Sequence, residues 1–233
     1  MNYKEPLVKA KICRIFNNMI VDVVLDDGSV SHAFCPEVDF NHQLYSVDRV
    51  VYLTKSADKR RKIPYICQMC DVGSSLVFVN YKYKNKLFLE AFHKGILDAD
   101  FGRFVRVREI EADDLLKMVN FELLSDNGER AFVYVVDIFN KIGDDVVFPS
   151  SINFFELEMF EELKRMRAKG ADTYVFLIVP REDCKQAKFV WSQDPIAAAK
   201  IYDEVQSGLK FCCYSCNVNQ KSVSIAQKMN ICY

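Results

Sequence analysis

Two neighbouring stretches in the middle of the chain, residues 118–124 and 131–139, are dominated by β-branched and aromatic residues with polar ones spaced between them. Side chains of these types favour strands. The short segment between the two stretches contains Gly128, which can adopt the positive φ of a tight turn. The pattern therefore predicts a β-hairpin over residues 118–139.

After the hairpin the apolar residues follow a helical period. They recur at intervals of three from Phe154 to Met166, with Asn153 and Glu156 placed as a capping box and Gly170 as a stop. An apolar strand is predicted over residues 173–179, and a second helix from Asp194-Pro195 to residue 206. We expect residues 209–218 to form the last strand, so that strands and helices alternate as in an α/β domain.

The first 80 residues show a different organisation, because short strand-like stretches follow one another there without a helical period. The stretches are residues 7–16, 20–25, 30–34, 49–53 and 76–79. Asp26-Asp27-Gly28 between the second and the third is a hairpin signal. Five short strands without a helix predict a small closed barrel of the OB-fold type.

Helical spacing begins near residue 85, with Phe88, Ala91, Phe92 and Ile96 on one face of the predicted helix. The change of period places a domain boundary there. We therefore predict an OB-like barrel in residues 1–85 and a mixed-sheet α/β domain in residues 86–233. The whole chain is predicted to be of the α/β class.

Charge is unevenly distributed, although the formal net charge of the chain is only -1. Eight Lys and Arg residues but two Asp lie between Lys55 and Lys86. Basic side chains follow a phosphate backbone, and exposed aromatic rings offer faces on which bases stack. We therefore expect nucleic acid to bind here; the alternative is an ordinary solvated loop. The candidate binding residues are Lys59, Arg60, Arg61, Lys62, Tyr81, Lys82, Tyr83 and Lys84.

Nine cysteines include two CxxC pairs, Cys67 with Cys70 and Cys213 with Cys216. Both pairs lie in strand-like sequence, where residues three apart point to opposite faces, so we expect buried thiols and no zinc site. The chain has no apolar run of the roughly 20 residues that span a bilayer, and no signal-peptide core near Met1. We expect no membrane segment and a cytoplasmic location.

Several short motifs occur together in a characteristic order. In the barrel they are Asp26-Asp27-Gly28, Cys35-Pro36, Lys59 to Lys62 with Pro64, Val79-Asn80 and Asn85; in the second domain they are Glu109, the hairpin, Phe148-Pro149, Glu162-Leu163 and Gly208. In this order and spacing the chain resembles the sugar fermentation stimulation protein family. The resemblance implies an OB-fold joined to a restriction-endonuclease-like domain, and DNA as the ligand.

The nuclease-like signature of that family has a carboxylate ahead of the hairpin, an Asp on its first strand and Glu-x-Lys on its second. Glu109 retains the first carboxylate, but Asn120, Tyr134 and Val136 stand where the Asp, Glu and Lys belong. These residues cannot neutralise a divalent cation as carboxylates do. We therefore expect an inactive nuclease-like domain, with no catalytic residues and no cofactor.

Two alternatives remain open. In the first, the chain is a divergent metal-dependent nuclease that binds Mg²⁺ at a displaced site, for which Glu109 and Glu122 are weak candidate ligands. In the second, it is a protein-interaction or regulatory subunit whose second domain contacts a partner, or another copy of the chain, through Phe155 and Met159.

Overall fold

A computed structural model describes most of the chain. The described residues are 1–17, 19–36, 44–56, 58, 60–110, 119–149, 154–192 and 194–233, and the side chains of residues 17 and 154–157 are outside the description. They divide into two compact units. The first consists of Met1–Tyr83, Pro180–Asp183 and Cys216–Ser224, and the second of Lys84–Val179, Cys184–Ser215 and Ile225–Tyr233.

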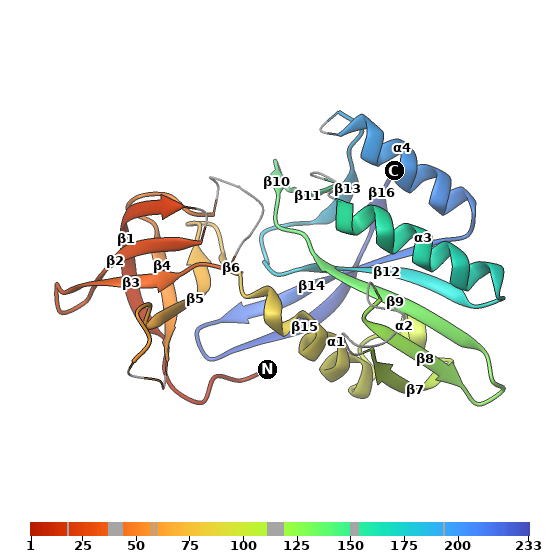
Figure 1. Cartoon of the computed structure of the whole chain (residues 1–233), viewed down its shortest axis with the longest axis horizontal. Helices are drawn as coiled ribbons and strands as arrows, with labels where there is room; N and C mark the ends of the chain where they lie inside the picture. The colour runs from red at the N-terminus through yellow and green to blue at the C-terminus, as the bar shows by residue number, and fades with distance from the viewer. Residues whose placement is uncertain are drawn as a thin grey trace. The chain divides into compact units, whose positions relative to one another are not determined.

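The first unit is built on a closed five-stranded barrel (Figure 1). Its strands are β1 (Val8–Asn17), β2 (Ile20–Leu25), β3 (Val30–Phe34), β4 (Val50–Lys55) and β5 (Tyr65–Asp71). They pair in the order β3-β2-β1-β4-β5, and a parallel ladder between β3 and β5 closes the ring. This is the strand order and closure of an OB-type barrel, as the sequence predicts.

The fifth strand of the barrel differs from the prediction. It is β5, whereas the predicted stretch at 76–79 forms β6 (Leu76–Phe78), which pairs with β5 outside the ring. Nearly every residue of β5 is buried, so its sequence lacks the alternation that reveals a half-exposed strand. The amide of buried Gln68 is satisfied by hydrogen bonds with Thr54 and Asn80.

The second unit contains a six-stranded mixed sheet in the order β15-β14-β12-β9-β8-β7. Strands β9, β12 and β14 are parallel, while β7, β8 and β9 form an antiparallel meander. The elements are α1 (Lys84–His93), α2 (Asp98–Phe101), β7 (Phe104–Glu109), β8 (Phe121–Ser125), β9 (Arg130–Asp137), α3 (Phe154–Ala168), β12 (Asp172–Val179), α4 (Pro195–Gln206), β14 (Lys210–Asn219) and β15 (Ser222–Met229).

A smaller sheet belongs to the same unit. It runs β10-β11-β13-β16, with β10 (Lys141–Ile142), β11 (Asp145–Phe148), β13 (Gln186–Phe189) and β16 (Ile231–Cys232). The prediction that residues 209–218 form the last strand is wrong, because β15 and β16 follow β14. In β15 buried residues alternate with partly exposed ones over its first half and not beyond, so the strand signal is short.

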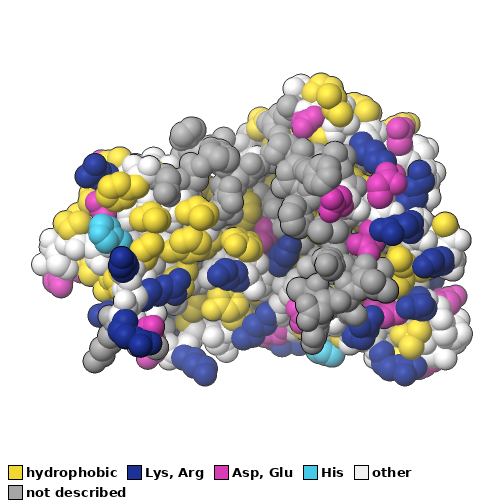
Figure 2. All heavy atoms as spheres, viewed as in Figure 1, with side chains coloured by type: hydrophobic (Ala, Val, Ile, Leu, Met, Phe, Trp, Pro, Cys, Tyr) yellow, Lys and Arg dark blue, Asp and Glu magenta, His cyan; other side chains and the backbone are white. Residues whose placement is uncertain are grey.

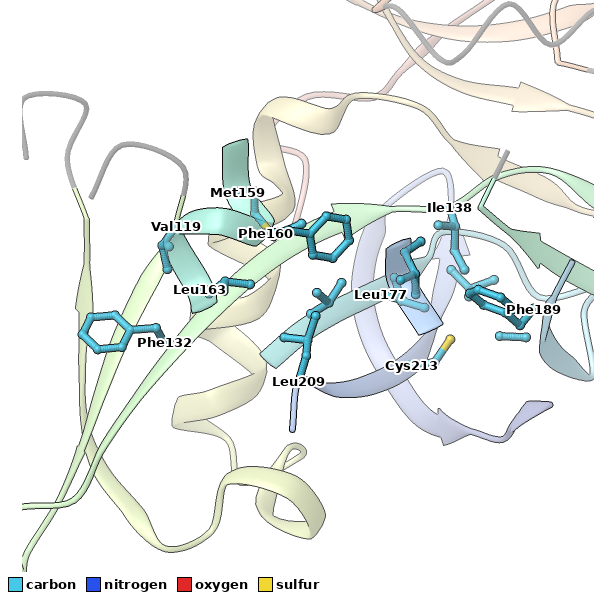
Figure 3. Packing of buried hydrophobic residues seen from close by; sticks show 14 of the residues in the cluster. Val119, Phe132, Ile138, Met159, Phe160, Leu163, Leu177, Phe189, Leu209 and Cys213 are labelled. Carbon is cyan, nitrogen blue, oxygen red and sulfur yellow. The ribbon is translucent and has the colours of Figure 1, made fainter. Parts of the chain in front are cut away.

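Helices cover both faces of the large sheet. On one face Phe88 of α1 stacks on Phe121 with ring centroids 4.6 Å apart and meets Phe176 edge-on at 5.0 Å. On the other face Phe160 and Leu163 of α3 pack in a core cluster with Leu177 and Phe132 (Figure 3). This arrangement explains why β12 is apolar almost throughout: seven of its eight residues are buried.

The predicted helix signals are borne out at their ends. Asp194 caps α4 by accepting a hydrogen bond from the Ala197 N–H at 2.9 Å. Gly170 and Gly208 follow the two long helices with φ of +83° and +96°, values that favour glycine. The predicted capping residue Asn153 lies outside the described residues.

Candidate nucleic-acid interface and nuclease-like site

The most basic segment of the chain is the loop that joins β4 to β5, and we call residues 55–62 the basic loop. A hydrogen bond from the Ser56 N–H to the Pro64 carbonyl, 2.7 Å long, closes the base of this connection. The β3–β5 ladder begins at Ala33 and Tyr65, so the residues ahead of Tyr65 leave the barrel alongside β3. The end of the loop therefore lies close to the point where β5 begins to pair with β3.

Three of the four clustered cations are described, and all three are exposed. The side chain of Arg60 is 92% exposed, and its Nε lies 3.2 Å from Asp58 Oδ1. Hydrogen bonds from the Arg60 backbone and guanidinium lower the pKa of the Asp58 carboxyl. Arg61 and Lys62 form no side-chain ion pair with any described residue. Lys59, the fourth candidate, lies outside the described residues. Figure 2 shows Lys and Arg side chains gathered on the visible face of the barrel.

The remaining candidates, residues 81–84, are divided between the two units. Tyr81 and Lys82 are exposed in a short 3-10 helix (Tyr81–Tyr83). Tyr83 is partly buried and packs against Phe78, with ring centroids 6.2 Å apart. Lys84 begins α1 in the second unit, and its ammonium group lies 5.4 Å from the centroid of the Tyr134 ring. The four residues thus have different surroundings: two are exposed, Tyr83 packs against Phe78, and Lys84 lies near the Tyr134 ring.

An exposed aromatic site on the barrel escaped the sequence reasoning. Phe16 of β1 is 48% exposed, although alternation from Ala10 and Ile12 would turn it inward. Two register shifts between β1 and β2, one after Ile12 and one after Ile15, change the direction of the following side chains. A bulge depends on pairing with another strand, so the local sequence carried no signal for it.

In the second unit Asn120, which stands where the family resemblance places an Asp, takes part in a chain of hydrogen bonds. Asn120 accepts a hydrogen bond from the Val135 N–H through Oδ1 at 2.6 Å and donates through Nδ2 to Asn85 Oδ1 at 3.0 Å. Asn85, in the first turn of α1, in turn donates to Glu109 Oε1 at 2.8 Å. The chain links β7, α1 and β9 through neutral amides and one carboxylate.

The other two signature positions carry no metal ligand. Tyr134 and Val136 are partly buried and pack against the core cluster. Their neighbour Asp137 is partly buried too, and burial raises the pKa of its carboxyl to about 7, with the charge of Lys84 acting in the opposite direction. Across the described ranges, no group of three or more His, Cys, Asp or Glu side chains is placed to hold a metal ion.

Glu122, the second weak metal candidate, lies between two arginines. Its Oε2 accepts hydrogen bonds from Arg108 at 2.9 and 3.0 Å, and its Oε1 accepts one from Arg130 Nε at 2.7 Å. Burial alone would raise the pKa of this carboxyl, but the two guanidinium groups outweigh burial and lower it. The charge of Glu122 is thus already compensated within the sheet.

Two further expectations concern buried residues. Cys67, Cys70, Cys213 and Cys216 are free thiols buried in strands, as expected. Met159, which the protein-interaction alternative places at a partner contact, is only 2% exposed and packs in the core cluster, so this residue cannot offer that contact. Phe155 has a side chain outside the description.

In the part of the chain that the structure describes, no helix is both long enough and apolar enough to cross a membrane.

Comparison with known proteins agrees with the geometry of both units. The family described as "Sugar fermentation stimulation protein RE domain" matches residues 82–222. A sugar fermentation stimulation protein homolog from Caulobacter vibrioides is 25% identical over 226 residues, which cover 97% of this chain and 94% of that protein. A homolog from Magnetococcus marinus is 24% identical over 230 residues, which cover 99% and 98% of the two chains.

The same fold is found in a solved structure, that of Pyrococcus furiosus SfsA in complex with Ca²⁺. It matches 99% of this chain and 97% of its own with a TM-score of 0.83 and 15% identity. The shared fold includes the OB-like barrel and the mixed sheet with its helices. The family match extends over more than half of the chain. The chain therefore belongs to the sugar fermentation stimulation protein family.

Proposed function

We propose that this chain is a nucleic-acid-binding protein whose barrel holds the phosphate backbone through the basic loop. The observation that carries the proposal is the position of that loop. In OB-folds the face of the second and third strands and the loops after the first and fourth strands bind oligonucleotides. Here the loop after β4 is the most basic segment of the chain and leaves the barrel beside β3. DNA is the favoured ligand because the family resemblance implies DNA.

The electrostatics of the loop support this proposal. Asp58 offsets part of the charge of Arg60, but Arg61 and Lys62 are exposed and have no ion-pair partner in the described ranges. The chain as a whole has a net charge of -1, so attraction of a polyanion depends on such local clusters. Binding of this kind requires no cofactor, and we propose none. We also propose that the protein acts in the cytoplasm.

We further propose that the second unit does not hydrolyse its ligand. A divalent cation in a protein site is held by oxygen ligands that include at least one or two carboxylates. The signature positions offer Asn120, Tyr134 and Val136 in their place, and the Asn120 oxygen already accepts the Val135 N–H. The residues present therefore do not fit Mg²⁺, and Ca²⁺ binding by the P. furiosus protein does not extend to this chain.

A binding titration with labelled single- and double-stranded oligonucleotides at several salt concentrations tests the proposal. For a single strand, the logarithm of the affinity should fall with the logarithm of the salt concentration by about 0.7 per neutralised phosphate. We expect the triple variant Arg60→Ala/Arg61→Ala/Lys62→Ala to lose roughly 2 units of that slope and at least about tenfold in affinity at moderate salt.

The matched control is Lys164→Ala/Arg165→Ala/Lys169→Ala, which removes three exposed cations at the end of α3 and changes the net charge equally. We expect it to bind as the parent does. Absence of binding at low salt, or equal losses in the two triples, would refute a role for the basic loop.

The same titration in EDTA and in Mg²⁺ addresses hydrolysis. We expect equal affinity and an intact oligonucleotide in both buffers. Cleavage that requires Mg²⁺ and is lost in Glu109→Gln or Glu122→Gln would favour the divergent nuclease instead.

A further inference from the structure

The outer face of the barrel carries an aromatic side chain that is not part of a buried hydrophobic core. Phe16 lies near the end of β1, just ahead of the loop to β2, and 48% of it is exposed. Ile15 and Met19, 41% exposed each, flank it in the sequence. A large apolar ring held at a strand end beside other exposed apolar residues marks a contact surface.

Two nitrogen-containing side chains surround the Phe16 ring. The guanidinium carbon of Arg14 lies 4.6 Å from the ring centroid, a cation–π distance. The ring of His32 on β3 meets the Phe16 ring at 67° with centroids 6.2 Å apart. Phe16 is thus held in place at its side and over one face, while almost half of its surface stays open to solvent.

His32 is itself oriented by a neighbour. Its Nδ1 lies 2.6 Å from Asp22 Oδ1, with Asp22 on the strand between β1 and β3. Asp22 pairs with Arg14 in the β1–β2 ladder and with His32 in the β2–β3 ladder. A His whose Nδ1 donates to a carboxylate keeps Nε2 for a second hydrogen bond. The row Arg14, Asp22 and His32 therefore crosses the three strands and presents polar groups around one ring.

We infer that Phe16 is a stacking platform for an unpaired base, and that the ligand of the barrel is single-stranded nucleic acid. The inference rests on the proposed function and narrows its ligand class. A base can stack on a protein ring only when it is not stacked within a duplex, and stacking accepts any base because every base has a π-face. Arg14 supplies a cation beside the stacked base, where the phosphate backbone passes.

The position of this site relative to the basic loop supports the same ligand. The basic loop leaves the barrel alongside β3, and His32 lies on β3 directly ahead of Ala33, the first residue paired with β5. The two features therefore flank the same strand of one compact unit. Proteins that bind single strands without sequence preference combine cations that follow the backbone with aromatic rings on which bases stack.

The test compares Phe16→Ala with the loop triple on single- and double-stranded oligonucleotides. Loss of one stacked base should weaken single-strand binding about 5- to 150-fold, the range that corresponds to roughly 1–3 kcal/mol per base. We expect the salt slope and the duplex affinity to stay as in the parent, because no cation is removed. Ile196→Ala, at an apolar residue of α4 in the second unit that is 84% exposed, is the matched control and should bind normally.

A second variant gives a direct signal of stacking. Trp191 is the only tryptophan of the chain and lies in the second unit. In Phe16→Trp/Trp191→Phe the fluorescence reports only from the barrel, and oligo(dT) should quench it while affinity stays near that of the parent. This variant also keeps the ring, so it separates stacking from a folding defect in Phe16→Ala.

The outcomes distinguish this inference from the proposed function. If the triple variant of the basic loop weakens binding but Phe16→Ala does not, Phe16 does not stack on a base. The proposed function would still hold in that case. Equal losses on single strands and duplexes in Phe16→Ala would overturn the single-strand assignment. A change of oligomeric state in Phe16→Ala, seen by light scattering without a change in affinity, would show that the ring contacts another copy. If the parent binds neither oligonucleotide, both proposals fail.

Discussion

Asp137 shows how burial changes the protonation of a single side chain. Its carboxyl lies at the end of β9, accepts no hydrogen bond from any described residue, and has a pKa that burial raises to about 7. Lys84 is the cation that opposes this shift. The residue is thus a partly buried acid that holds its proton well above the pH at which a solvated Asp releases it.

Asp137→Asn should therefore stabilise the protein at pH 8. In the unfolded chain the carboxyl loses its proton near pH 4, whereas in the folded chain it does so only near pH 7. The folded state binds more protons between these values, so stability falls as the pH rises through this window. We expect the variant to exceed the parent by about 2 kcal/mol at pH 8 and to equal it near pH 4.

Urea denaturation at both pH values measures this difference. Asp144→Asn is the control, since Asp144 is exposed and the hydrogen bond and charge of Lys185 lower its pKa. The control should show no gain at pH 8. A parent and an Asp137→Asn variant with the same pH dependence would contradict the assignment of a raised pKa to Asp137.

Asn120 shows which properties of the site could be predicted from the sequence and which could not. The sequence alone shows that position 120 carries an uncharged amide. It does not show what this amide contacts, because Asn120 forms hydrogen bonds with Val135 and Asn85, which lie 15 and 35 positions away. The same holds for Glu122, whose two arginine partners come from neighbouring strands.

At the scale of elements, a buried ion pair ties α3 to α4. Arg167 of α3 donates to Glu204 of α4, and their side chains are 11% and 4% exposed. Arg167 also donates to the Thr173 hydroxyl at 2.9 Å, and Lys200 lies 3.2 Å from the second Glu204 oxygen. Removing Glu204 would leave a guanidinium group buried without its carboxylate.

We expect Glu204→Ala to cost about 3–5 kcal/mol of the free energy of unfolding, as the loss of one partner from a buried pair does. Glu161→Ala is the matched control, because Glu161 binds the same Lys200 from an exposed position and its loss should cost under about 1 kcal/mol. Denaturant titration compares the two variants. The double variant Arg167→Met/Glu204→Leu should recover most of the loss; equal costs for Glu204→Ala and Glu161→Ala would show that the buried pair has no special role.

Elements with a clear period were predictable, and elements without one were not. The helix at 195–206 was bounded correctly because Asp194, Pro195 and Gly208 are local signals. Strand β5 was missed as the closing strand because burial on both sides removes alternation, and β15 because its alternation is short. The bulges of β1 were missed because they exist only in the pairing with β2.

At the scale of the whole molecule, the first unit is assembled from three separate parts of the sequence. Residues 180–183 and 216–224 belong to it together with the first 83. The Val223 N–H donates to the Met1 carbonyl at 2.9 Å, the Tyr3 N–H to the Lys221 carbonyl at 3.0 Å, and the Phe78 N–H to the Pro180 carbonyl at 2.9 Å. The predicted domain boundary at residue 85 remains a prediction.

A fragment of residues 1–83 tests that division. We expect it to be less stable than the barrel of the full chain by on the order of 2–4 kcal/mol, because several backbone hydrogen bonds lose their partners. Urea denaturation followed by circular dichroism measures the fragment, and a synthetic peptide of residues 214–226 should restore part of the loss. A fragment as stable as the barrel in the full chain, with no response to the peptide, would show that the first 83 residues fold alone.

The sequence by itself determined the two-part organisation, most strands and helices, and the basic loop. It also fixes Asn120, Tyr134 and Val136 at the positions where the family resemblance places an Asp, a Glu and a Lys. These properties depend on residue type and on periods within a few residues, which the sequence displays directly. The tertiary structure alone decided which strand closes the barrel, that Phe16 faces solvent, that Met159 is buried and that Glu122 lies between two arginines. Each of these follows from contacts between residues far apart in the chain, and such contacts leave no period for local patterns to reveal.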